Sequence, residues 1–377
     1  MEYKLSELVT IKYGKNQSEV VDIDGKYPIL GTGGIIGYSN QYLYNKPSVL
    51  IGRKGSIKNV KYIDKPFWTI DTLFYTIINE NIVIPKYLFY KLSQSDLSTY
   101  NEGSAVPSLT TATLNQIKIE IPSLKEQKRI ADILTALDDK IELNNQMNQT
   151  LEEIASLLYK RWFVDFELPD DKGNLYKSSG GEIVESELGM IPKGWEVKNL
   201  TEIAKFVNGL AMQKFRPQIN EESLPVLKIK ELISNSVSKS TERCKKNIKD
   251  EVKVFDGDII FSWSGTLAVK IWSGGEAGLN QHLFKVTSSI YPKWLYYLIV
   301  LYNLNNFKSI ASDKATTMGH INRSHLEKTY FTIPQIKIIN KEYTYMETII
   351  DKIIENKVNI KYLQETKEKV MLDLIQI

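Results

Sequence analysis

The amino-acid sequence repeats itself over about half its length. Residues 5–8 recur as residues 200–203, and residues 55–74 align without a gap with residues 265–284. Solenoid repeats are much shorter, because each of their units is a single supersecondary element. The long period therefore predicts two homologous domains in one polypeptide, related by a pseudo-two-fold axis. Duplex DNA is the commonest partner with matching near two-fold symmetry.

Later segments recur in the same order, which extends the repeat over the whole chain. They are residues 85–88 and 292–295, residues 121–122 and 333–334, and residues 139–144 and 351–356. Each copy ends in a long helical pattern. The 377 residues are enough for two domains of ordinary size and the helices that connect them.

The composition, 42% hydrophobic and 25% charged, is typical of a globular protein. No apolar run approaches the roughly 18 residues of a membrane helix, and residues 1–4 contain no apolar signal core. The single cysteine, Cys244, argues against a disulfide framework and a thiolate zinc site. We therefore expect a cytoplasmic protein without membrane association. The net charge of +3 permits nucleic-acid binding but does not require it.

Residues 1–122 form the first predicted domain. Short apolar runs at 27–30, 48–51, 69–78 and 117–121 have the length and β-branching of strands. Residues 4–9 and 85–97 show helical patterns, the second with proline at its start. This mixture predicts an α/β domain with a curved or barrel-like sheet.

A different pattern begins at Ser123, which fits the N-cap of a capping box with Glu126. Apolar residues then recur at alternating spacings of four and three through residues 123–166, and again through residues 335–377. Each segment predicts a long spacer helix, and about forty residues correspond to roughly 60 Å. The predicted seam residues are Ile130, Leu134, Leu137, Ile141, Asn144, Leu151 and Trp162 in the first helix, and Ile349, Ile353, Asn356, Ile360 and Leu363 in the second.

The order of the segments predicts an α+β molecule whose two domains are separated by an antiparallel coiled coil of its own two helices. Residues 167–194, rich in Gly, Ser, Pro and acids, are expected to be a surface linker, and residues 195–334 the second domain. Asn144 and Asn356 fall in apolar seams, where a polar residue can fix the register. The alternative is a solvent-exposed position at the edge of the seam.

Three stretches resemble the specificity subunits of type I restriction-modification systems. They are residues 121–130 at the start of the first helix, residues 158–166 at its end, and residues 187–197 before the second domain. The match extends over the whole chain in order. Residues 1–5 lack the Pro-x-Gly-Trp lead-in of the second domain, and Glu126-Gln127 has no counterpart at the start of the second helix.

The resemblance implies a non-catalytic DNA-recognition subunit. Two target-recognition domains would each read one half of a bipartite site in double-stranded DNA. The helices would dock two adenine-N6 methyltransferase subunits and, in a restriction assembly, motor-nuclease subunits. S-adenosylmethionine would be bound by the methyltransferase partners, so we expect no cofactor on this chain.

The motifs that would indicate catalysis are incomplete. Residues 31–37 follow a strand but fail the G-x-G-x-x-G spacing at Ile36, so a tight turn with positive φ is favoured over a phosphate loop. The three histidines, His282, His320 and His325, form no ligand pattern, so we expect no metal site. No Asn-Pro-Pro-aromatic motif of an amino-methyltransferase is present.

Comparison of the two copies gives candidates for DNA contact. Positions that match between the copies should build the fold, and loop positions that differ should read different bases. Arg53, for example, could bind guanine O6 and N7 or a phosphate. The candidates are Lys15, Asn16, Arg53, Lys54, Ser56, Ser104 and Ser108 in the first copy, and Lys214, Arg216, Trp263, Ser264, Thr266, Thr316, Thr317, His320 and Arg323 in the second. The alternative for each is a solvated loop residue.

Two other classes of function stay open. The chain could be a coiled-coil adaptor whose domains bind proteins, and salt-sensitive DNA binding would distinguish the two. It could also be an enzyme with a hidden hydrolase or transferase site. The lack of a recognisable nucleophile–base pair disfavours that class.

Overall fold

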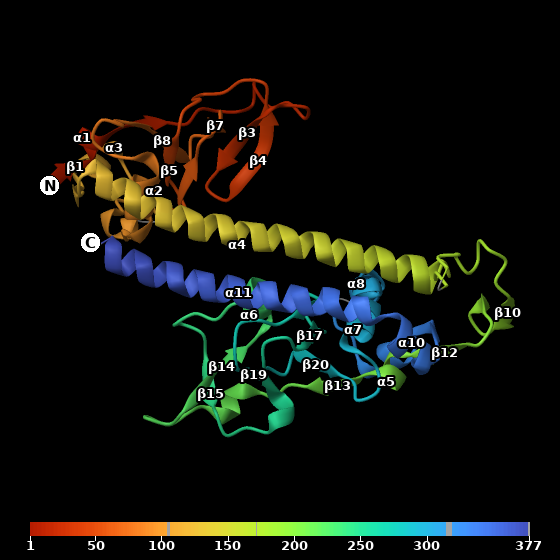
Figure 1. Ribbon diagram of the computed structural model, residues 1–377. Coiled ribbons are helices and arrows are strands. Elements are labelled where there is room, and N and C mark those ends of the chain that lie inside the picture. Colours follow the sequence, from red (N-terminus) through yellow and green to blue (C-terminus); the bar gives the residue numbers. More distant parts are fainter. Residues whose placement is uncertain (104–105, 171, 314–318, 376–377) are drawn as a thin grey trace. The chain divides into compact units, whose positions relative to one another are not determined.

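The computed structural model describes residues 1–103, 106–170, 172–313 and 319–375 (Figure 1). The chain divides into two compact units. One contains residues 1–140 with the described residues from 363 onward, and the other contains Ile141–Tyr362. Each unit therefore holds one α/β domain together with part of each of two long helices.

The first domain is built from small open sheets. Strands β1 (Glu2–Lys4) and β9 (Lys118–Glu120) pair antiparallel. A four-stranded sheet has the order β2 (Val9–Tyr13), β8 (Leu73–Ile78), β5 (Ser48–Gly52) and β6 (Val60–Ile63), and a three-stranded sheet has the order β4 (Gly34–Ser39), β3 (Tyr27–Gly31) and β7 (Trp68–Thr69). The helices are α1 (Leu5–Leu8), α2 (Pro85–Gln94), η1 (Leu97–Tyr100) and α3 (Thr111–Gln116).

The second domain repeats this plan. Strands β12 (Trp195–Asn199) and β21 (Tyr330–Pro334) pair antiparallel. One four-stranded sheet has the order β13 (Lys205–Asn208), β20 (Leu283–Thr287), β17 (Ile259–Ser262) and β18 (Ala268–Ile271). A second four-stranded sheet has the order β15 (Arg243–Lys245), β14 (Ser223–Leu227), β19 (Ala277–Leu279) and β16 (Lys253–Val254). The helices are α5 (Leu200–Ile203), η3 (Met212–Phe215), α6 (Ile229–Ser234), η4 (Asp250–Val252), α7 (Lys293–Tyr302), α8 (Leu304–Asp313) and α9 (Arg323–Glu327).

The strand orders confirm that the domains share one topology. β2-β8-β5-β6 corresponds to β13-β20-β17-β18, and the parallel pair β3·β7 corresponds to the parallel pair β14·β19. Of the expected curved or barrel-like sheet, the barrel-like form is wrong, because the strands of each domain are divided among separate sheets. The turn expected within residues 31–37 is confirmed, since β3 and β4 form a hairpin and Gly34 has φ of +134°.

The first spacer segment forms α4 (Leu124–Tyr159), followed by one π-helical turn, η2 (Lys160–Val164). The Ser123 hydroxyl accepts a hydrogen bond from the Glu126 N–H at 3.4 Å, as an N-cap does. The Glu126 carboxylate, however, accepts from Arg129 and does not close the expected capping box.

The second spacer segment differs from the single helix expected over 335–377. It consists of α10 (Ile336–Glu342) and α11 (Thr344–Leu374), interrupted at Tyr343. Tyr343 leaves the helical conformation, and its ring lies 5.4–5.6 Å from those of Trp162, Phe163 and Trp294. Burial of this aromatic ring in the core gives a physical reason for the break, since the sequence contains no Gly or Pro there.

The two long helices pack antiparallel within each unit. In the first unit, the Lys367 ammonium of α11 donates to the Asp138 carboxylate of α4 at 2.5 Å. In the second unit, Lys357 pairs with Glu152 at 3.1 Å. Residue numbers therefore rise along one helix as they fall along the other, which confirms the α+β class with two paired helices.

The predicted seam is only partly buried. Its buried members are Ile130, Leu134, Asn144, Trp162, Ile353 and Asn356. Its half-buried members are Leu137, Ile141, Leu151, Ile349, Ile360 and Leu363. The asparagines are buried in the seam and not at its exposed edge.

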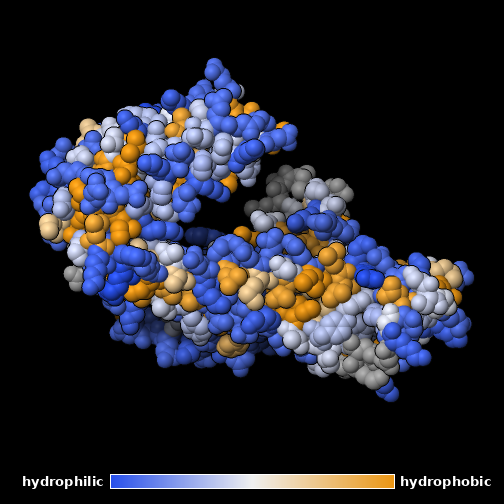
Figure 2. All heavy atoms as spheres, turned by 45° about the horizontal axis from the view of Figure 1, so that its top comes forward, coloured by the Kyte–Doolittle hydropathy of each residue, from blue (hydrophilic) through white to orange (hydrophobic). Residues whose placement is uncertain are grey.

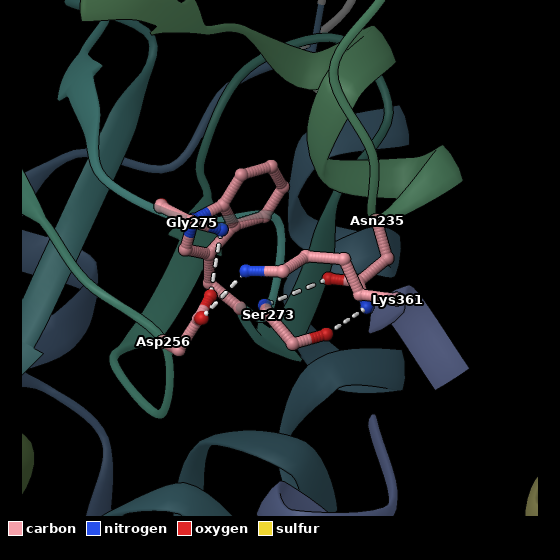
Figure 3. A network of polar contacts seen from close by, with 6 residues as sticks. Asn235, Asp256, Ser273, Gly275 and Lys361 are labelled. Atoms are coloured by element: carbon pink, nitrogen blue, oxygen red, sulfur yellow. Dashed lines mark hydrogen bonds and ion pairs between the residues drawn. The ribbon is translucent and has the colours of Figure 1, made fainter. Parts of the chain in front are cut away.

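A polar network attaches α11 to the second domain (Figure 3). The Lys361 ammonium pairs with Asp256 at 3.0 Å, and the other oxygen of Asp256 accepts from the Gly275 N–H at 2.6 Å. The Trp272 indole donates to the Gly275 carbonyl at 2.6 Å. Ser273 and Asn235 extend the network through two further hydrogen bonds.

The segment 167–194, which was expected to be a surface linker, contains a hairpin of β10 (Ile183–Ser186) and β11 (Gly189–Pro192).

Candidate nucleic-acid interface

Two loops that are far apart in the first domain's sequence lie side by side in the structure. Lys54 and Ser108 form an isolated antiparallel bridge. The Leu109 N–H donates to the Arg53 carbonyl at 2.9 Å, and the Gly55 N–H donates to the Pro107 carbonyl at 2.9 Å. The loop after β5 and the segment before α3 therefore form one surface.

The second domain brings the corresponding positions together by the same backbone contacts. Ser264 and His320 form the equivalent bridge. The Ile321 N–H donates to the Trp263 carbonyl at 2.8 Å. Because Arg53, Ser108 and Leu109 correspond to Trp263, His320 and Ile321, the two domains share this backbone frame.

A third loop joins each frame at the end of β2 or β13. The Gly14 N–H donates to the Leu73 carbonyl, and the Gly209 N–H donates to the Leu283 carbonyl, both at 3.0 Å. A Cβ atom at either glycine would lie 2.0–2.2 Å from a backbone oxygen, at Ile70 or Asn280. Only glycine fits this close backbone approach, which explains why this residue recurs in both copies.

The frames display different side chains. In the first domain, the Arg53 guanidinium lies 5.1 Å from the centre of the Tyr13 ring, and its Nη1 donates to the Asp71 carbonyl at 3.0 Å. In the second domain, Trp263 takes the place of Arg53 and Asn208 takes the place of Tyr13. The Trp263 indole N–H donates to Asn208 Oδ1 at 3.3 Å.

Two histidine rings surround Trp263. The centroid of the indole lies 5.9 Å from that of His282 and 6.4 Å from that of His320. The Phe284 ring lies 5.7 Å away on the core side. His282 and His320 are exposed, whereas Trp263 is half-buried. The second domain therefore presents an aromatic surface rich in imidazole where the first presents a guanidinium.

Residues 1–153 and 192–362 match the family described as the type I restriction modification DNA specificity domain. The chain belongs to this family. The MjaIX specificity subunit of Methanocaldococcus jannaschii is 28% identical over 349 residues, which span 88% of this chain and 78% of that protein. The HindI specificity subunit of Haemophilus influenzae is 24% identical over 374 residues, which span 82% of this chain and 80% of that protein.

The fold is also that of a solved structure. The type I restriction-modification S subunit from M. genitalium aligns with a TM-score of 0.64 at 13% identity, over 99% of this chain and 95% of that one. The match of both copies to DNA specificity domains agrees with the resemblance found in the sequence.

The remaining candidates on these DNA specificity domains differ in position. Lys15, Asn16, Lys54, Ser56, Lys214, Arg216 and Thr266 are exposed. The Asn16 side chain accepts from the Ser18 N–H at 2.9 Å and so orders its own loop. Ser264 is only 8% exposed, and a direct base contact from its hydroxyl is therefore not supported. Ser104, Thr316 and Thr317 lie outside the described residues.

Arg323 borders a pocket beside the second frame. Its side chain is 81% exposed and lies 3.5 Å from the Glu327 carboxylate. It lines a pocket of about 620 Å³ together with Asn208, Phe284 and Ser288. Since Asn208 and Phe284 also contact Trp263, Arg323 belongs to the same region of the domain.

The candidates predicted from the sequence did not include two pairs of positions, Tyr13 with Asn208 and Thr72 with His282, although the repeat already showed that His282 replaces Thr72. Tyr13 and Asn208 are the last residues of their strands, and Thr72 and His282 directly precede a strand. Both pairs differ between the copies, so the alignment of the two copies could have identified them as candidates for DNA contact. Among the described residues, no group of three or more His, Cys, Asp or Glu side chains could hold a metal ion. No helix in the described ranges has the length and hydrophobicity to cross a membrane.

Proposed function

We propose that this chain is the DNA specificity subunit of a type I restriction-modification enzyme, and that each of its domains reads one half of a bipartite site. The observation that carries the proposal is the shared frame, in which equivalent backbone hydrogen bonds hold different side chains, Arg53 against Trp263 and Ser108 against His320. A duplicated fold with diverged surface residues suits the recognition of two different half-sites.

The chemistry of the displayed residues fits base recognition. Arginine can donate two parallel hydrogen bonds to guanine O6 and N7, and hydroxyl and imidazole groups can donate or accept at base edges. The exposed lysines Lys15, Lys54 and Lys214 would bind backbone phosphates and so position each domain without reading sequence.

We further propose that α4 and α11 dock the methyltransferase subunits, on which S-adenosylmethionine would supply the methyl group. Figure 2 shows hydrophobic residues (orange) gathered in patches on the face that it presents. On α4, Leu143, Ile154 and Leu157 are 48%, 40% and 67% exposed. Residues 143 and 154 are about three helical turns apart and so share a face. Exposed apolar residues on one face of a helix are typical of a partner interface.

The chain itself would contribute no covalent chemistry. It would select the site, and the methyltransferase subunits would flip and methylate an adenine in each half. The length and pairing of the helices would set the number of base pairs between the two halves, as dimer geometry sets operator spacing.

The test is to express the chain together with its methyltransferase subunit in a host that lacks adenine methylation, and to map N6-methyladenine by single-molecule sequencing. We expect methylation at one bipartite motif, which disappears when this chain is omitted. Binding of the complex to a duplex containing that motif should weaken steeply as salt rises. Methylation that is unchanged without the chain would refute the proposal, and salt-insensitive binding to proteins alone would favour a coiled-coil adaptor.

A further inference from the structure

The immediate neighbours of Trp263 limit what this residue can do. Its single donor, the indole N–H, is directed to Asn208 Oδ1 at 3.3 Å. Tryptophan has no other hydrogen-bonding group. While that contact is formed, Trp263 can offer bases its ring face but no hydrogen bond. Reading of base edges must then come from other side chains around it.

His282 and His320 are placed to supply those hydrogen bonds. Both are exposed, and their rings lie near the indole from two different segments, one before β20 and one before α9. An imidazole has two nitrogens and can both donate and accept. In His282, Nε2 lies 3.3 Å from the side-chain nitrogen of Gln281, so Nδ1 is the nitrogen that we assign to base recognition. The packing of both rings against Trp263 restricts where those nitrogens can lie.

The first domain uses a different chemistry at the same positions. The ring of Tyr13 supports the Arg53 guanidinium, and the Asp71 carbonyl accepts one of the five N–H groups that arginine carries. Tyr13 rests in turn on Phe74 at 5.0 Å, and Phe74 corresponds to Phe284 beneath Trp263. In both domains, a residue at the end of the first sheet strand therefore fixes the residue at position 53 or 263.

We propose that His282 and His320 are the specificity-determining residues of the second domain, and that Asn208 and Trp263 are positioning residues that hold them. Tyr13 has the equivalent positioning role for Arg53 in the first domain. The inference rests on the proposed function and adds to it the residues through which the second half-site is read.

The first experiment uses the methylating complex with the His282→Ala variant of this chain. At one base pair of the second half-site, we expect the preference for the correct base to fall by about tenfold, as for loss of one good base contact. The first half-site should keep its full preference. His325→Ala, in the same domain, is the matched control, because His325 Nδ1 accepts from the backbone N–H of Asn322 at 3.1 Å. That control should leave the preference unchanged.

The second experiment tests positioning by removing one hydrogen bond from either side. Trp263→Phe keeps an aromatic ring without the N–H, and Asn208→Ala removes the acceptor. Both variants should relax the same base pairs that His282→Ala and His320→Ala relax, and Asn208→Asp, which keeps an acceptor, should restore the preference. A purely structural role would lower methylation of every sequence equally and leave the base preference unchanged.

The outcomes separate this inference from the proposed function. If the wild-type complex methylates no bipartite motif, the proposed function fails. If it methylates one, and His282→Ala and His282→Asn both keep the full preference at every base pair, the assignment of His282 is overturned while the function stands. If the Asn208 and Trp263 variants leave the preference intact, the positioning role is overturned.

Discussion

Asn144 should respond to mutation in the opposite way from most buried residues. It lies in α4 and is 2% exposed, and its Nδ2 has no hydrogen-bond partner among the described residues. A buried donor without a partner costs about 1–3 kcal/mol. We therefore expect Asn144→Leu to increase the free energy of unfolding by about that amount, with apolar burial adding to the gain. For a unit of roughly 200 residues, this corresponds to an increase in Tm of about 2–12 °C.

Asn356→Leu provides the matched comparison within the same helix pair. Asn356 is also 2% exposed, but its Nδ2 donates to Asn148 Oδ1 at 3.1 Å. Its replacement leaves the amide of Asn148 buried without that partner. Because both variants gain one leucine, the difference between them isolates the hydrogen bonds and should reach about 2 kcal/mol or more in favour of Asn144→Leu.

The measurement is thermal unfolding of the full chain, followed by circular dichroism at 222 nm. A Tm for Asn144→Leu at or below that of Asn356→Leu would refute the reasoning. It would show that the Asn144 amide is satisfied in solution or that the seam cannot accept a leucine there. A stabilised Asn144→Leu variant with altered spacing of the methylated site would support a register-setting role for this residue.

Four further predictions concern the helices, the network and the DNA surface. Insertion of four residues into the middle of α4 should shift or abolish recognition of the bipartite site in methylation mapping, with little change in circular dichroism. Lys361→Ala should leave Asp256 unpaired and lower stability by no more than about 1 kcal/mol in urea unfolding, since both side chains are partly exposed. Burial raises the pKa of Tyr87 and of Tyr296 from 10.0 to about 12. The stability that comes from burying these two neutral phenols is therefore fully present below pH 10 and is lost as the pH rises through 12. Absorbance at 295 nm should show that the two phenols ionise later than exposed tyrosines. Arg53→Ala should either relax one base pair or weaken all DNA equally and reduce the salt dependence, and unchanged binding in both respects would remove Arg53 from the interface.

The repeat in the sequence predicted much of the architecture because its matched positions carry backbone constraints. Gly14 and Gly209 recur since no Cβ fits between the adjoining strands. The apolar pattern from Ser123 likewise predicted a helix because a continuous seam leaves few alternatives over that length. The recurring glycines and the apolar pattern depend only on residues that are near one another or regularly spaced in the sequence. Such patterns can be recognised in a single sequence.

The features that were not predicted depend on contacts between distant residues. The interruption at Tyr343 has no local signal and follows from the place of its ring beside Trp162 and Trp294. Asn356 was expected in the seam, but the heptad pattern could not say that Asn148, and not Asn144, would be its partner. Such pairings depend on the register of the two helices, which only the folded chain defines.

Divergence between the two copies is by itself an incomplete guide to the DNA surface. Lys54 and Ser264 occupy equivalent positions and differ, yet Ser264 is buried beneath its loop. Asn208 differs from Tyr13 and is exposed, but its carboxamide oxygen holds the Trp263 indole. A position that reads DNA must differ between the copies, be exposed and keep donors or acceptors that the protein does not occupy. In the second domain, His282 is exposed and keeps its Nδ1 for this purpose, although its Nε2 lies 3.3 Å from the side-chain nitrogen of Gln281. Trp263 is half-buried and its single side-chain donor is occupied by Asn208, although its size made it the more conspicuous candidate in the sequence.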